Sequence, residues 1–141
     1  MGYFFNHDSP LRSERHVNQK IVMAAKRIAG GSKEVLEMGD ITVRKEFTYA
    51  GDVVDGIWTL VQNNEVYEAV IGSGKAYSIE QWIEICFSYF GKDWRKYVEQ
   101  KADFISDYKV LVSEPHTIGS LGWHAETNIY TLAKLMIEGH E

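Results

Sequence analysis

The sequence predicts an α/β fold, a small mixed sheet with flanking helices. Segments with the two-residue alternation of strands follow segments whose apolar residues recur at helical spacing, and this order repeats along the chain. The 141 residues are one domain's length, and 45% of them are apolar, which is enough for a buried core. The sequence has no internal repeat, low-complexity tract or proline-rich linker. Residues 1–141 are therefore expected to form a single unit.

The first third of the chain predicts a strand, a helix and two further strands. Residues 3–5 are a short aromatic strand that runs into a polar cluster. A helix is expected over 16–29, because its apolar residues share one face and Gly30 follows, as glycine does at helix ends. Strands are expected over 35–38 and 43–49. The second of these should place Val43, Lys45, Phe47 and Tyr49 on one face and Arg44, Glu46 and Thr48 on the other.

The middle of the chain predicts two helices separated by a strand. Asp52 is the expected N-cap of the first helix, which is so rich in apolar residues that it should be well buried. Residues 69–71 form the strand. Ser78 and Gln81 have the spacing of a capping box, so the second helix should begin there and end at Gly91. Its inward residues should be Ile79, Trp82, Ile83, Cys86, Phe87 and Phe90.

The last third is less regular, and only its final helix is clearly indicated. Residues 92–104 show no clear period. Residues 108–112 are either a strand or the approach to a short helix that begins at 113–115. A turn is expected at 121–123, and Asn128 should cap the final helix. That helix should turn Ile129, Leu132, Leu135 and Met136 inward.

Composition excludes several classes of protein. The formal net charge is −5 and no basic patch is interleaved with aromatic residues, so nucleic acid is not an expected partner. No apolar run approaches membrane-spanning length, and the N-terminus lacks the pattern of a signal peptide, so a cytoplasmic protein without a membrane partner is expected. The single Cys86 lies in an apolar run and should be a buried structural thiol rather than a nucleophile.

Several groups of residues resemble functional motifs, but none is interpreted as a functional site. The run Gly72-Ser73-Gly74-Lys75 lacks the earlier glycine and the following Ser or Thr of a phosphate-binding loop, so a tight turn is the favoured interpretation. Tyr-x-x-x-Lys pairs start at Tyr97 and Tyr130, and the second should be a pair of neighbours on the C-terminal helix. His124 and Glu126 have no further ligands at suitable spacing, so a metal site is rejected.

Asn6 and His7 follow the first strand, at the place where an open α/β sheet presents side chains to a ligand. An asparagine there can bind a sugar hydroxyl or a phosphate, or it can cap its own loop. The sequence FNHDSP followed by VNQKI resembles the FNHESP…VTRKI segment of the GDP-mannose 4,6-dehydratases, which are extended short-chain dehydrogenase/reductase enzymes acting on nucleotide sugars. Similarity to this family extends over nearly the whole chain and includes LGW at 121–123.

The resemblance implies a substrate-binding site. Asn6 would contact the sugar diphosphate together with His7, and Lys20 would neutralise a phosphate. Lys45 stands where the family has an arginine that pairs with the diphosphate, which keeps the charge and loses the bidentate fork. A solvated strand lysine is the alternative for Lys45. Arg12 matches a family arginine near the nucleotide cofactor.

The resemblance also implies what the chain lacks. The family uses NADP or NAD, but this sequence has neither the glycine-rich turn of the cofactor site nor the upstream catalytic Tyr-x-x-x-Lys. We therefore expect the substrate-binding portion of such a lyase without most of its Rossmann domain, binding a GDP-mannose-like nucleotide sugar, holding no cofactor by itself and inactive alone. The alternative is a non-catalytic nucleotide-sugar-binding or regulatory module that docks on a full-length homologue.

Partners follow from the same resemblance. A separate N-terminal half or a homologous subunit could complete the fold. A strand pair without the rest of its sheet leaves backbone edges and an apolar face uncovered, so a homo-oligomer is expected.

Overall fold

The computed structural model describes residues 2–4, 7–62, 69–100, 110–111 and 116–139. Its helices are α1 (Val17–Ala29), α2 (Ala50–Val61), α3 (Ile79–Tyr89), α4 (His116–Ser120) and α5 (Ile129–Glu138), with a 3-10 turn, η1 (Trp94–Lys96). Its strands are β1 (Gly2–Phe4), β2 (His7–Asp8), β3 (Leu36–Met38), β4 (Arg44–Glu46), β5 (Thr48–Tyr49), β6 (Ala69–Ile71), β7 (Ala76–Ser78), β8 (Val98–Gln100) and β9 (Val110–Leu111).

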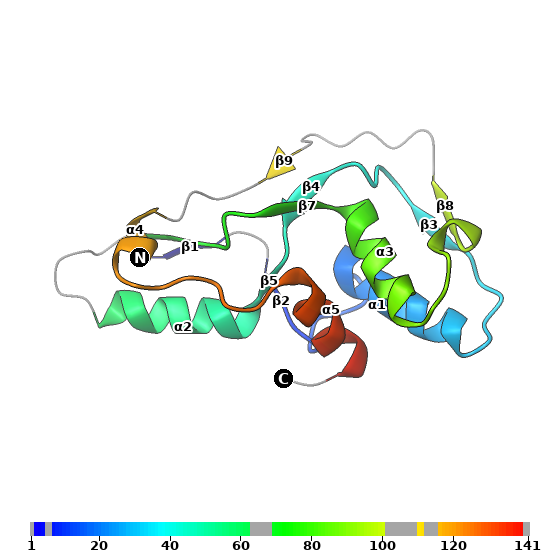
Figure 1. The fold of residues 1–141 in the computed structure, drawn as a ribbon, viewed down its shortest axis with the longest axis horizontal. Coiled ribbons are helices and arrows are strands. Elements are labelled where there is room, and N and C mark those ends of the chain that lie inside the picture. The colour runs from blue at the N-terminus through cyan, green and yellow to red at the C-terminus, as the bar shows by residue number, and fades with distance from the viewer. Residues whose placement is uncertain (1, 5–6, 63–68, 101–109, 112–115, 140–141) are drawn as a thin grey trace.

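The strands form several small sheets. The pairs β1–β6, β2–β5 and β3–β8 are each parallel. Strand β4 lies between β7, which is antiparallel to it, and β9, which is parallel to it. The molecule is elongated, with β1, β6, α2 and α4 at one end and α1, α3, β3 and β8 at the other (Figure 1). The predicted α/β class with small mixed sheets and flanking helices is confirmed.

The larger core lies where α1, α3 and α5 pack on one another. Trp82 of α3 is fully buried, and its ring stacks on that of Phe47 with 5.0 Å between centroids. The Trp82 indole N–H donates to the backbone carbonyl of Asn18 in α1 at 3.2 Å. This ring therefore joins α3, α1 and the segment that follows β4. Cys86 is buried in the same core, as predicted.

The smaller core lies at the other end, under α2. Its buried residues are Val53, Leu60, Ile71, Ile118 and Trp123. Helix α2 approaches β6 closely at Gly56, where a methyl group would lie 2.9 Å from the Ile71 side chain. Trp123 donates its indole N–H to the Asp52 carbonyl at 3.0 Å, which ties the 121–123 turn to the first turn of α2.

Helix ends are where the sequence predicted best. His16 is the N-cap of α1, and its side chain accepts the N–H of Asn18. Ser78 and Gln81 form the predicted capping box of α3, and Asn128 caps α5. The prediction for α2 was wrong, because the helix begins at Ala50 with Tyr49 as its N-cap. The Asp52 carboxylate instead accepts the N–H of Thr127 at 2.8 Å.

The single alternating strand predicted over 43–49 is also wrong. Phe47 interrupts it, so that β4 and β5 pair with different partners. Lys45 and Glu46 are adjacent, yet both are buried. Strand β7, which was not predicted, follows the 72–74 turn and pairs with β4. Lys45 is only 5% exposed, so it is not a solvated strand lysine.

Helix α2 differs most from its prediction. Its four most exposed large apolar residues are Val54 at 62%, Ile57 at 39%, Trp58 at 62% and Val61 at 68%. The helix was expected to be well buried, but it buries only one face. In the described part of the chain, no helix is long and apolar enough to cross a membrane.

Candidate functional site

The candidate site is a group of charged side chains around Asp8, at the end of β2. Asp8 is only 2% exposed. Its carboxylate accepts a hydrogen bond from the Asn18 side-chain amide of α1. The Arg12 Nε lies 3.8 Å from the carboxylate and the His16 Nδ1 lies 3.7 Å from it. Because a buried carboxylate is costly without a hydrogen-bond donor or a cation beside it, the Asn18 amide and the Arg12 guanidinium stabilise its charge.

The loop between β2 and α1 is folded so that Arg12 returns to Asp8. The Arg12 N–H donates to the Ser9 carbonyl at 3.1 Å, which closes a turn. The Gln19 amide of α1 donates to the Pro10 carbonyl at 3.2 Å. These two bonds fasten the loop to the start of α1, so the Arg12 guanidinium stays near the end of the strand.

Lys45 reaches this group from β4. It is 5% exposed, and its Nζ lies 5.3 Å from the centroid of the Phe47 ring. Burial lowers the pKa of the Lys45 ammonium from 10.5 to about 8, because the charged form loses its hydration. The Asp8 carboxylate raises this pKa and the Arg12 guanidinium lowers it. Two segments far apart in the sequence, residues 8–12 and β4, therefore bring one carboxylate and two cations together.

The remaining predicted residues are placed less closely or lie outside the described residues. Lys20 is exposed on α1, and its Nζ donates to the Glu37 carbonyl of β3 at 2.9 Å. An ammonium has three donors, so this bond leaves Lys20 able to contact an anion. Asn6 lies outside the described residues. His7 belongs to β2 by its backbone, and its side chain is outside the description. Among these predicted residues, the structure brings together Arg12 and Lys45.

A second buried carboxylate, Glu46, holds the 72–74 turn. Glu46 is fully buried and accepts the Ser73 backbone N–H at 2.7 Å and the Ser73 hydroxyl at 3.3 Å. Since a protein carboxylate already occupies this N–H, the turn does not fit a cofactor diphosphate. Ser73 and Lys75 line a cavity of about 290 Å³ together with Trp123 and His124.

Asp8 and Glu46 were not predicted as parts of the site. Asp8 could have been found, because an acid four residues before Arg12, in a loop that leaves a strand, suggests an ion pair. Glu46 gave no such signal, because in a strand its neighbour Lys45 should lie on the opposite face. Among the described residues, no group of three or more His, Cys, Asp or Glu side chains is placed to hold a metal ion.

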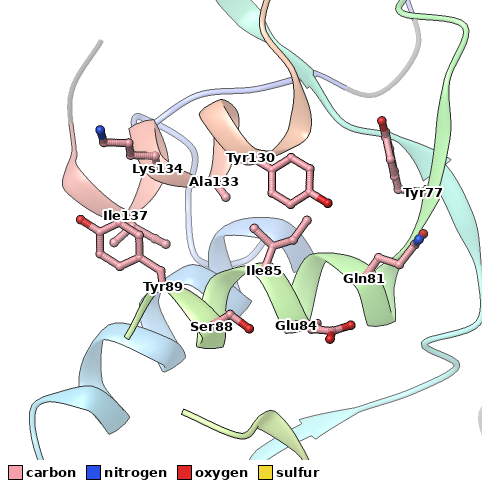
Figure 2. Close-up of a pocket in the computed structure, with 10 residues that line it drawn as sticks. All are labelled: Tyr77, Gln81, Glu84, Ile85, Ser88, Tyr89, Tyr130, Ala133, Lys134 and Ile137. Atoms are coloured by element: carbon pink, nitrogen blue, oxygen red, sulfur yellow. The ribbon is translucent and has the colours of Figure 1, made fainter. Parts of the chain in front are cut away.

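A groove lies elsewhere on the described part of the chain, between α3 and α5 (Figure 2). It has a volume of about 560 Å³. Ile85 of α3 and Ala133 and Ile137 of α5 lie between the rings of Tyr89 and Tyr130. Tyr130 and Lys134 both belong to α5, so the prediction that they are neighbours on the C-terminal helix is confirmed.

Comparison with known proteins relates this chain to one family. The family model for GDP-mannose 4,6 dehydratase matches residues 1–136. The chain belongs to this family. GDP-mannose 4,6 dehydratase 2 of Arabidopsis thaliana is 29% identical over 140 residues, which are 97% of this chain and 38% of that protein. The chain thus spans less than half the length of this relative.

Solved structures agree on the fold. RMD from Pseudomonas aeruginosa, complexed with NADPH, matches with a TM-score of 0.89 at 20% identity, over 98% of this chain and 46% of that one. MoeE5, in complex with UDP-glucuronic acid and NAD, matches with a TM-score of 0.81 at 22% identity, over 98% and 45%. The predicted relation to the extended short-chain dehydrogenases is therefore confirmed, and this chain corresponds to a little under half of their fold.

Proposed function

We propose that this chain is the nucleotide-sugar-binding portion of a GDP-mannose 4,6-dehydratase-like lyase, and that it is inactive alone. The carrying observation is the group formed by Lys45, Arg12 and Asp8. Two cations and one carboxylate leave a net positive charge, which suits the diphosphate of a nucleotide sugar. Family membership supports GDP-mannose as the ligand class. Structural relatives whose complexes contain UDP-glucose or UDP-glucuronic acid support nucleotide sugars in general.

The roles of the side chains follow from their surroundings. Lys45 acts as a buried point charge toward a phosphate, held by the Phe47 ring and by Asp8. Arg12 is partly exposed, and its guanidinium offers several N–H donors to a phosphate. Lys20 and Asn6 are further contacts to the ligand. Asp8 keeps the two cations in place without itself facing an anion.

Turnover requires more than this chain offers. A 4,6-dehydratase of this family binds its hydride carrier, NADP or NAD, in a dinucleotide-binding portion. Among the described residues, the 72–74 turn is the only turn that follows a parallel strand and has a glycine at each end. Its Ser73 N–H already donates a hydrogen bond to the Glu46 carboxylate. We therefore propose that the chain completes a catalytic unit only with a polypeptide that carries the cofactor site and the catalytic tyrosine.

Calorimetric titration with GDP-mannose tests the binding proposal. We expect binding that Lys45→Met weakens by at least about tenfold, since a charge-assisted bond to phosphate is worth about 1.5–3 kcal/mol. Lys20→Ala should weaken it as well. Lys26→Ala is the matched control, because Lys26 is exposed on the same helix as Lys20 and should leave the affinity unchanged. Absence of GDP-mannose binding, or equal loss in the control, would contradict the proposal.

Product analysis with added NADP tests the lack of turnover. We expect the purified chain to release no dehydrated sugar from GDP-mannose. If it does, the chain is an enzyme by itself and the proposal of an inactive portion is wrong. If it binds GDP-mannose and changes the activity of an intact relative without contributing a catalytic half, the alternative of a regulatory module is correct.

A further inference from the structure

Lys45 belongs to a closed ring of contacts that joins the candidate site to the larger core. Its Nζ lies over the Phe47 ring, 5.3 Å from the centroid, and the Phe47 ring stacks on that of Trp82 with 5.0 Å between centroids. The Trp82 indole N–H donates to the Asn18 backbone carbonyl at 3.2 Å. The Asn18 side-chain amide donates to the carboxylate of Asp8, which in turn acts on the charge of Lys45. The ring therefore begins and ends at one ammonium.

The members of this ring are held firmly. Trp82 and Asn18 are fully buried, and Phe47 is nearly so. The indole N–H of Trp82 is tied to a carbonyl of α1, and the Phe47 ring lies within 20° of parallel to the indole. Because close packing and this hydrogen bond leave the indole little freedom to turn, the stacked Phe47 ring also keeps its orientation. One face of Phe47 is thus kept toward the Lys45 ammonium.

The face of Phe47 favours the charged form of Lys45. An aromatic face attracts a cation, and the attraction is stronger where the cation has lost its hydration. Lys45 is 5% exposed, and burial lowers the pKa of its ammonium to about 8. The Phe47 ring and the Asp8 carboxylate oppose this effect of burial. Since a phosphate is attracted by the ammonium and not by the neutral amine, the ring of contacts bears on phosphate binding.

We infer that Trp82 is a positioning residue of the proposed diphosphate site: it fixes the Phe47 ring against the Lys45 ammonium and so keeps Lys45 charged. Trp82 is fully buried and acts on a ligand only through these two neighbours. The inference rests on the proposed function for its ligand, whereas the contacts from Trp82 to Lys45 do not depend on it.

Other titratable groups bear on Lys45, and all of them stay in place in the variants below. Arg12 lowers the pKa of the ammonium and Asp8 raises it. Tyr77 of β7 is the register partner of Lys45 in the β4–β7 pair, and His16 Nδ1 lies 3.7 Å from the Asp8 carboxylate. Because these groups are common to every variant, a comparison at one pH cancels their own titration.

Titration of Lys45 by NMR tests the inference without a ligand. The chain carries isotope-labelled lysine, and the Lys45 signal is the one that Lys45→Met removes. We expect Trp82→Leu to lower the pKa of Lys45 by about one unit, because the Phe47 ring is no longer held against a desolvated cation. Trp82→Phe should restore the pKa, since a phenyl ring can still stack on Phe47. Phe87→Leu is the matched control, because Phe87 is also a fully buried ring of α3 but stacks on Tyr97.

The affinity for GDP-mannose separates positioning from mere support of the core. A decrease of the Lys45 pKa from about 8 to about 7 lowers its charged fraction at about pH 7.5 about threefold, so Trp82→Leu should weaken binding about threefold. At about pH 6 Lys45 is charged in both proteins, and the two affinities should agree. A loss of affinity that is equal at the two pH values would show that Trp82 only supports the core, and it would overturn the inference.

A second variant decides the matter if Trp82→Leu does not fold. Phe47→Leu removes the ring itself, and it should lower the pKa of Lys45 in the same way. An unchanged pKa in the folded variant, or an equal decrease in Phe87→Leu, would overturn the inference. If Trp82→Leu lowers the pKa as expected but the wild type does not bind GDP-mannose, the link from Trp82 to Lys45 is supported and the proposed function is wrong.

Discussion

Titration of Lys45 should make the stability of this protein depend on alkaline pH. In the folded chain the pKa of Lys45 is about 8, compared with 10.5 for an exposed lysine. Between these values the unfolded chain binds a proton that the folded chain does not, so the free energy of unfolding rises with pH. A difference of about 2.5 pKa units corresponds to about 3 kcal/mol. This stabilisation is absent below about pH 8 and complete only above about pH 10.5.

The variant Lys45→Met isolates this effect. Urea unfolding of both proteins, followed by tryptophan fluorescence at several pH values from about 7 to about 10, gives the difference in unfolding free energy. We expect the unfolding free energy of the wild type to rise relative to that of the variant by up to about 1.4 kcal/mol per pH unit above pH 8. Trp82 is a suitable reporter, because it stacks on Phe47 near Lys45.

A difference in unfolding free energy between wild type and Lys45→Met that stays constant over this pH range would refute the reasoning. It would mean that Lys45 keeps its ordinary pKa and is hydrated, in contradiction to its burial. Lys26→Met is the control, since Lys26 is exposed on α1 and its difference from the wild type should not change with pH. The same titration predicts that affinity for GDP-mannose falls as the pH rises through about 8, because neutral Lys45 no longer attracts a phosphate.

Three further predictions concern the packing and the helix ends. Gly56→Ala should lower the free energy of unfolding, measured by urea unfolding, by about 1 kcal/mol. Crowding against Ile71 costs about 1–3 kcal/mol, which exceeds the gain in helix propensity of about 1 kcal/mol. Ser78→Ala removes the capping bond of α3 and should cost about 1 kcal/mol in the same assay, whereas Ser88→Ala, exposed on that helix, should change it by less than about 0.5 kcal/mol. Cys86 should react with iodoacetamide only when urea unfolds the chain, because burial encloses its thiol and raises its pKa; rapid labelling of the native chain, seen by mass spectrometry, would contradict this.

Local signals in the sequence were sufficient to predict two helix caps and the family. Ser78 and Asn128 cap their helices through contacts with residues three positions away. Such contacts depend only on nearby sequence, so they can be predicted without the tertiary structure. The motif FNHDSP and its neighbours carried the relation to the GDP-mannose 4,6-dehydratases for the same reason, since each matched residue keeps its place along the chain.

Burial was decided only by the tertiary structure. Lys45 and Glu46 are adjacent in β4, and alternation predicted that one of them would face solvent. Both are buried in the folded chain: Ser73, far along the chain, donates hydrogen bonds to Glu46, and the Phe47 ring lies against Lys45. Helix α2 is rich in apolar residues, which in sequence indicates a buried helix; the folded chain covers only one of its faces. Apolar periodicity thus indicated which residues should be buried, whereas the contacts between distant segments decided which of them are buried within this chain.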